Sequence, residues 1–87
     1  MASYRLRFKR SVSKDLRTVP KPDVARILER IAALGSDPRP AGCEKLSGRE
    51  RYRIRQGDYR ILYEILDTEG VLLVVKVGHR RDVYRRQ

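Results

Sequence analysis

The chain has 87 residues and a formal net charge of +10 at pH 7, from 21 lysines and arginines against 11 acidic residues. This length fits one small domain spanning residues 1–87, and Cys43, the only cysteine, excludes an intramolecular disulfide. No stretch reaches the roughly 18 apolar residues of a membrane span, and the N-terminus lacks the apolar centre of a signal peptide. We therefore expect a cytoplasmic protein with no membrane contact.

The positive charge is concentrated in three segments. Residues 5–10, 49–60 and 79–86 carry net charges of +4, +3 and +3, which together equal the whole excess. A concentration of this kind is typical of nucleic-acid binding. The alternatives are a basic surface that favours solubility and a patch that docks an acidic protein.

The N-terminal half predicts one strand followed by two helices. Residues 4–8 alternate between apolar and basic side chains, which indicates a strand with Tyr4, Leu6 and Phe8 directed inward. Residues 11–19 and 22–34 carry apolar side chains at helical spacing, and Gly35 is a natural end for the second helix. The two helices should form a hairpin.

The C-terminal half predicts three strands. Residues 36–48, rich in proline and glycine, are expected to form a long loop. Strands follow over residues 51–56 and 59–66, joined by a tight turn, with Ile61, Tyr63 and Ile65 inward. Residues 71–77 are almost continuously apolar, as in a strand covered on both faces.

The predicted order is therefore β-α-α-β-β-β. This order indicates an α+β domain in which a twisted, mainly antiparallel sheet packs one face on the helix hairpin. No internal repeat or linker interrupts it.

A row of arginines is the most informative feature of the sequence. Arg51, Arg53 and Arg55 share one face of a strand, because side chains alternate with a period of two, while Tyr52 and Ile54 point into the core. A guanidinium presents fixed donors that match phosphate oxygens in pairs. The row therefore predicts a phosphate-binding surface; the alternative is a solvated strand face.

Further arginines should join this surface. Arg60 lies on the adjacent strand, and Arg80 follows the last strand, so we expect both to converge with Arg53 and Arg55 around one phosphate. Such a cluster would stabilise added negative charge in a phosphoryl-transfer transition state. Glu64 should lie on the same face and orient Arg60.

Two other side chains are candidates for chemistry. His79, the only histidine, ends the last strand and could act as a base, or it could simply bond the backbone. Tyr84 could stack on a nucleobase or donate a proton, or it could pack onto the core. The sequence contains no glycine-rich phosphate loop and no metal-ligand spacing, so we expect no metal and no cofactor.

These motifs together resemble the RelE branch of the RelE/ParE toxin superfamily from type II toxin–antitoxin modules. The resemblance covers the full length. Its densest signatures are Leu46-Ser-Gly48, Tyr52-Arg-Ile-Arg55, Gly57-Asp-Tyr-Arg-Ile-Leu-Tyr63 and Val77-Gly-His-Arg-Arg-Asp-Val-Tyr84.

The resemblance implies a fold similar to small microbial ribonucleases and a metal-independent mRNA interferase. RelE-type proteins enter the ribosomal A site and cut mRNA by attack of a ribose 2′-hydroxyl on the adjacent phosphate. By position, Arg60, Arg80 and Tyr84 match the family's catalytic arginines and stacking tyrosine. Arg53 and Arg55 occupy positions that are typically lysine.

This departure affects the general base. A guanidinium stays protonated and is a poor base, which makes His79 the best substitute for the family's lysine. The remaining basic residues are expected to contact RNA or the ribosome: Arg5, Arg7, Lys9, Arg10, Arg49, Arg51 and Arg81.

The resemblance also implies a partner, a RelB-like antitoxin with an acidic, partly disordered segment that folds on binding. The sequence does not indicate a homo-oligomeric state. Two other functions remain open: a ParE-like inhibitor that binds DNA gyrase, and a non-toxic RNA-binding domain.

Overall fold

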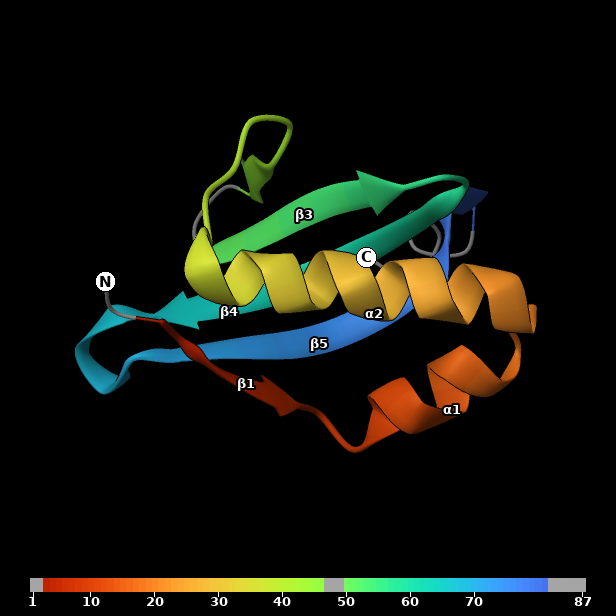
Figure 1. Cartoon of the computed structure of the whole chain (residues 1–87), viewed down its shortest axis with the longest axis horizontal. Helices are drawn as coiled ribbons and strands as arrows, with labels where there is room; N and C mark the ends of the chain where they lie inside the picture. Colours follow the sequence, from red (N-terminus) through yellow and green to blue (C-terminus); the bar gives the residue numbers. More distant parts are fainter. Residues whose placement is uncertain (1–2, 47–49, 82–87) are drawn as a thin grey trace.

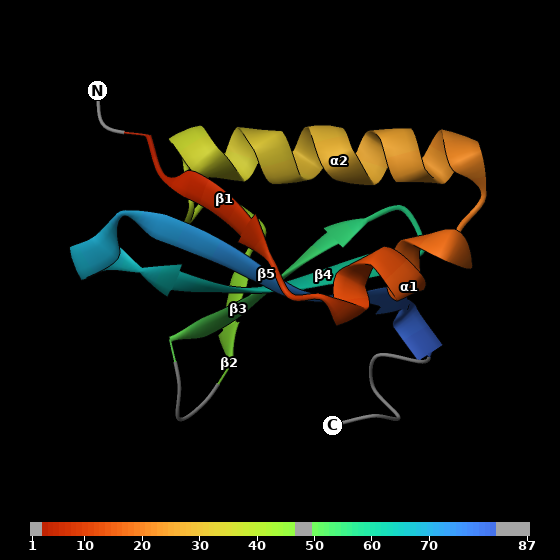
Figure 2. The same ribbon diagram turned by 90° about the horizontal axis from the view of Figure 1, so that it is seen from below.

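The computed structural model describes residues 3–46 and 50–81. Two layers are visible, a sheet and a layer of helices (Figures 1 and 2). In chain order the elements are β1 (Arg5–Phe8), α1 (Ser11–Arg17), α2 (Lys21–Ser36), β2 (Glu44–Leu46), β3 (Arg51–Gln56), β4 (Tyr59–Leu66), the 3₁₀ turn η1 (Asp67–Glu69) and β5 (Val71–His79).

The five strands form one mixed sheet in the order β1-β5-β4-β3-β2. The pair β1–β5 is parallel and the other pairs are antiparallel. Helix α2 lies across one face of the sheet, while α1 lies against β5 (Figure 2). The predicted α+β architecture is confirmed. Neither helix in the described ranges is long and apolar enough to cross a membrane.

The main core lies between α2 and the sheet. Tyr52 and Ile54 of β3 are buried there, as are the inward residues predicted for β4, so the predicted strand alternation is confirmed. Helix α2 supplies the facing side chains at helical spacing: Ile27, Ile31 and Leu34.

A smaller apolar cluster covers part of the opposite face. Leu62 and Val75 are buried in it, with Leu46 and Leu73 packed against them. Strand β5 therefore contributes apolar side chains to both faces, which explains why its sequence is almost continuously apolar. The register of β4 and β5 shifts between Leu62 and Tyr63, as a β-bulge would cause.

Two sequence predictions about the strands are wrong. The predicted loop over residues 36–48 contains β2, which pairs with β3 through Glu44↔Arg53 and Leu46↔Arg51. This three-residue strand has no strong local signal, because pairing with the edge of β3 creates it. Phe8 was predicted to point inward but stays 45% exposed. It is the last residue of the edge strand β1, where alternation sets the side to which a side chain points but does not ensure that other residues cover it.

Gly35 has a different role from the one predicted. Helix α2 continues through Ser36, so Gly35 does not end it. The Tyr4 N–H donates to the Gly35 carbonyl at 2.8 Å, and a Cβ on Gly35 would lie 3.3 Å from the Tyr4 carbonyl oxygen. The missing side chain lets β1 approach the last turn of α2.

Two leucines of α2 test how much stability this core provides. Leu34 is 1% exposed and Leu28 is 42% exposed. Leu34→Ala should lower the free energy of unfolding by about 2–5 kcal/mol, because it removes buried methyl groups and leaves a cavity. Leu28→Ala should change it by less than about 1 kcal/mol. Urea unfolding of both variants provides the measurement, and similar losses would contradict the assignment of the core.

Candidate phosphate-binding site

The β3–β4 hairpin aligns the arginines. Gln56 and Tyr59 pair across a two-residue loop in which Gly57 has a φ of 61°, a conformation that glycine adopts without strain. The same register sets Arg55 opposite Arg60. Because Ile54 and Ile61 point toward α2, alternation directs Arg55 and Arg60 to the other face of the sheet.

A cavity of about 450 Å³ lies at this end of β3. Of the four arginines expected to converge, Arg53, Arg55 and Arg60 line it, and Arg80 is not among the described lining residues. Arg30 of α2 supplies a fourth guanidinium, and the segment before β2 closes one side. The described lining residues are Arg30, Gly42, Glu44, Arg53, Ile54, Arg55 and Arg60.

Arg30 is a lining residue that the sequence pattern did not predict. This residue precedes the buried Ile31, and its Nε atom is buried without a hydrogen-bond partner among the described residues. Helical spacing identifies the core face of α2 but not which strand edge an adjacent polar side chain reaches. The position of α2 over β3 brings Arg30 to the cavity.

The cavity arginines differ in burial. Arg60 is 7% exposed, whereas Arg55 is exposed and Arg53 is intermediate. Burial fixes the Arg60 side chain and lowers the local dielectric, so its charge acts on a bound anion more strongly than a charge in water does. Arg60 therefore forms the fixed part of the site and Arg55 its accessible part.

Glu44 brings a carboxylate into the arginine cavity. Arg53 donates from Nε and Nη2 to Glu44 Oε1, at 3.1 and 2.5 Å. The hydrogen bond from Arg53 and then its charge hold the pKa of Glu44 below its usual range, and the charges of Arg60 and Arg55 act in the same direction. Glu44 is thus within electrostatic reach of all three strand arginines.

Arg51 takes no part in the cavity lining described above. It donates from Nη2 to Glu64 at 2.7 Å, and Arg51 and Glu64 are direct cross-strand partners. The prediction that Glu64 orients Arg60 is therefore wrong. The two residues are on the same strand but four positions apart, about 13 Å along an extended chain.

His79 lies in a different place from the arginines. Its ring meets the Tyr59 ring edge-on, with centroids 5.7 Å apart, and it lines a second cavity of about 630 Å³ beside α1. His79 is two positions after the buried Val77, so alternation places it on the helix side of the sheet. The structure does not bring His79 together with Arg60.

Asp15 of α1 organises the second cavity. Its Oδ2 accepts a hydrogen bond from the Val77 N–H at 3.1 Å, and its Oδ1 pairs with Lys76 at 3.6 Å. These contacts dock α1 on the end of β5. Asp15 therefore has an evident structural role at this cavity.

The other predicted contact residues occupy several places. Arg80 is exposed and lies beside the hairpin turn, where its N–H donates to the Asp58 carbonyl at 2.9 Å, and it is not among the described residues that line the arginine cavity. The Arg81 N–H faces His79 Nδ1 at 3.4 Å.

Tyr84 and Arg49 lie outside the described residues. The four basic residues around β1 are exposed: Arg5, Arg7, Lys9 and Arg10.

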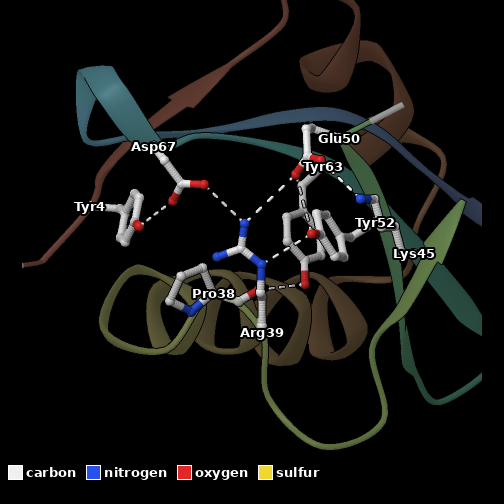
Figure 3. Close-up of polar contacts among 8 residues, drawn as sticks. All are labelled: Tyr4, Pro38, Arg39, Lys45, Glu50, Tyr52, Tyr63 and Asp67. Carbon is white, nitrogen blue, oxygen red and sulfur yellow. Dashed lines mark hydrogen bonds and ion pairs between the residues drawn. The ribbon is translucent and has the colours of Figure 1, made fainter. Parts of the chain in front are cut away.

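A polar network fixes the segment that leads into the cavity (Figure 3). Arg39 donates to Asp67 and to the Tyr52 hydroxyl, both at 3.0 Å, and its guanidinium lies 5.3 Å from the centre of the Tyr52 ring. The Tyr4 hydroxyl also donates to Asp67. Arg39 therefore connects the segment after α2 to β3, η1 and the start of β1.

Tyr63 anchors the same segment from inside the core. Its hydroxyl donates to the Pro38 carbonyl at 2.8 Å, and burial raises the pKa of Tyr63 above its usual range. With Pro38 and Arg39 both held, the segment continues to the cavity, where Gly42 and Glu44 belong to the described lining. Within residues 3–46 and 50–81, no three His, Cys, Asp or Glu side chains gather as a metal site requires.

Comparison with known proteins identifies the family. The profile described as "ParE toxin of type II toxin-antitoxin system, parDE" matches residues 6–84. The chain belongs to the RelE/ParE toxin superfamily. Toxin RelG of Mycobacterium tuberculosis is 32% identical over 95% of this chain and 98% of its own length, and the putative toxin RelE1 of Methanocaldococcus jannaschii is 26% identical over 94% and 96%. Both relatives assign the chain to the RelE branch.

Solved structures of the superfamily have the same fold. The toxin–antitoxin complex RelBE2 of M. tuberculosis contains a chain with a TM-score of 0.81 and 28% identity, covering 92% of this chain and 94% of that one. A RelE variant of E. coli in the free state has a TM-score of 0.79 and 25% identity, covering 95% and 92%. The chain is thus a RelE-type toxin of a type II toxin–antitoxin system.

The Arg53–Glu44 pair can be tested by titration. Arg53→Ala should raise the pKa of Glu44 toward its usual range, because it removes the hydrogen bonds that contribute most to the lowering. Carbon-13 NMR of the carboxyl groups gives the measurement. Glu50 is the internal control, since Lys45 lowers its pKa and that pair does not involve Arg53. An unchanged Glu44 pKa would show that the pair does not form in solution.

Proposed function

We propose that this toxin is an endoribonuclease that cuts mRNA in the ribosomal A site in the cytoplasm, without a metal ion. The observation that carries the proposal is the cavity with four arginines. Guanidiniums bind phosphate oxygens in pairs, and four around one phosphate match the charge of a transition state rather than of a small neutral ligand.

In the proposed reaction the ribose 2′-oxygen attacks the adjacent phosphorus. The new O–P bond forms as the bond to the 5′-oxygen of the next nucleotide breaks, leaving a 2′,3′-cyclic phosphate and a 5′-hydroxyl. The 2′-hydroxyl loses its proton and the leaving oxygen gains one. Negative charge builds on the non-bridging oxygens, which is where Arg55 and Arg60 would donate.

The arginines stabilise charge but do not take the proton. A guanidinium has no acceptor, so Arg53 and Arg55 cannot replace a lysine base. In-line orientation of the 2′-oxygen, set by contacts on both sides of the cut, supplies a large part of the acceleration in such a reaction. We propose that Tyr84 stacks on a base and that ribosomal RNA helps to hold the message.

The exposed arginines provide the wider RNA contact. Arg5 and Arg7 point to the same side of the sheet as Arg53 and Arg55, because Leu6 between them packs toward the helices. This side carries positive charge at β1 and at β3, on either side of the smaller apolar cluster, and would attract ribosomal RNA at long range. Arg10, Lys9, Arg80 and Arg81 would extend the contact at its ends.

We further propose that a RelB-like antitoxin neutralises the toxin. Solved relatives include RelBE and RelE–RelB complexes. Phe8 and Leu28 are large apolar side chains that remain exposed here, and an amphipathic, acidic segment could cover them while pairing with the basic face. Recovery of the chain alone from cells that express the whole operon would count against this partner.

Arginine substitutions test the nuclease activity. Arg55→Ala and Arg60→Ala should each slow cleavage of A-site mRNA about 10²–10³-fold, the scale for losing one transition-state donor. Arg17→Ala removes the same charge from an exposed position on α1 and should leave the rate unchanged. Primer extension on mRNA in a translating extract, with purified toxin, provides the measurement.

The same experiment contains two controls for interpretation. Because Arg60 is 7% exposed, its variant must be shown to be folded by its unfolding midpoint. Intact mRNA combined with loss of gyrase supercoiling would support ParE-like gyrase inhibition instead. Equal cleavage by the wild type and the Arg55→Ala/Arg60→Ala double variant would exclude the arginine cavity as the site.

A histidine substitution tests the general base. His79 lies on the helix side of the sheet, so we expect His79→Gln to lower the single-turnover cleavage rate by less than about tenfold, whereas loss of a general base costs about 10²-fold or more. Gln preserves a polar side chain of similar size. A fall of 100-fold or more, with an unchanged unfolding midpoint, would restore His79 as the base.

A further inference from the structure

Glu44 is the acidic residue among the described lining of the arginine cavity. Both donors that Arg53 directs at it, Nε and Nη2, converge on a single oxygen, Oε1. These two donors form the edge of the guanidinium that binds phosphate oxygens in bidentate recognition. The carboxylate therefore occupies the place where an RNA phosphate would meet Arg53.

We propose that Glu44 is an internal counter-ion that holds the phosphate-binding edge of Arg53 in the free toxin and is displaced when an RNA phosphate enters. The inference rests on the proposed function, because it takes the arginine cavity as the phosphate site. It adds a residue that sets the affinity of that site.

The exposure of the two partners favours displacement of the acid. The side chain of Glu44 is 65% exposed, while that of Arg53 is 22% exposed. Glu44 stands on the three-residue edge strand β2, whereas Arg53 is in the interior of the β3–β4 hairpin. Rotation of the Glu44 side chain into water would thus expose the Nε–Nη2 edge of Arg53 while the arginine stays in place.

The strengths of the two interactions also favour exchange. An ion pair with a solvent-exposed partner is screened by water and contributes little, so Glu44 competes only weakly. A phosphate meets the donors of Arg53 and also those of Arg55 and Arg60, which line the same cavity. The pair still has a purpose in the free protein, because Arg55 and Arg60 face each other directly and a nearby carboxylate reduces their repulsion.

A catalytic base would look different. A carboxylate that accepts two hydrogen bonds from a guanidinium has its charged form stabilised, and the pKa of Glu44 is lowered rather than raised toward neutrality. Enzymes raise carboxyl pKa values for base or acid work near neutral pH. Glu44 has the properties of a counter-ion, and the two roles predict opposite effects of substitution.

Binding of a fluorescein-labelled single-stranded oligodeoxynucleotide tests the proposal. DNA has no 2′-hydroxyl, so the purified toxin cannot cut the probe by the proposed reaction. At low salt, Glu44→Gln and Glu44→Ala should bind it about two- to fivefold more tightly than the wild type, because a competing charge of this strength is removed. The gain should shrink at high salt. Glu44→Ala is included because the glutamine oxygen can still accept from Arg53.

Glu69→Gln is the matched control. It removes the same charge from an exposed position on η1, and its affinity should remain within about twofold of the wild type, because a single distant charge is screened. Fluorescence anisotropy gives the affinities, and single-turnover mRNA cleavage is measured on the same samples. At saturating toxin, both Glu44 variants should cut at the wild-type rate or faster.

Three outcomes are distinguishable. If Arg53→Ala binds the probe as tightly as the wild type does, the arginine cavity is not the phosphate site and the proposed function fails with it. If the wild type depends on Arg53 but the Glu44 variants show no gain, only the counter-ion role is overturned. If the Glu44 variants cut about 100-fold more slowly at saturation, Glu44 is a base and the proposal is also overturned.

Discussion

The alternation of side chains in the β3–β4 hairpin is the constraint on which the structure depends. One register directs Ile54 and Ile61 into the core beneath α2 and, on the other face, sets Arg55 opposite Arg60. Like charges directly opposite each other destabilise a strand pair. A hairpin optimised for stability alone would not place two arginines there, so the cost is consistent with a site that is completed by an anion.

Several contacts offset this cost. The main core and the smaller cluster around Leu62 and Val75 hold β4 from both faces. At the other end of the hairpin, Arg51 is balanced by Glu64 across the strands, with both side chains about a quarter exposed. The positive charge of the hairpin is thus neutralised at the end where Arg51 pairs with Glu64. At the other end, which lines the cavity, positive charge is in excess and Glu44 is the nearby carboxylate.

The sequence predicts the parts of the site that depend on contacts between residues close together in the chain, and it does not predict the parts that depend on contacts between distant segments. Convergence of Arg53, Arg55 and Arg60 depends on a period of two and a short turn, and both are local. The contributions of Arg30, of the Arg39 network and of Glu44 depend on how α2 and its following segment cross β3, which local periodicity does not encode. The side of the sheet that His79 occupies could have been predicted from the sequence, because His79 lies two residues after the apolar Val77. His79 was instead grouped with the arginines because it is next to Arg80 in the chain.

The choice of arginine over lysine in β3 gives the site its character. A guanidinium is charged throughout the physiological pH range, and the lowered pKa of Glu44 keeps that carboxylate ionised over the same range. The Arg53–Glu44 pair therefore cannot be opened by protonation near neutral pH. In the proposed counter-ion role it opens when another anion competes for Arg53, so the state of the cavity would depend on what occupies it rather than on pH. A site of this kind relies on positioned charge, so in the proposed reaction the geometry of the bound RNA, more than proton transfer, would set the rate.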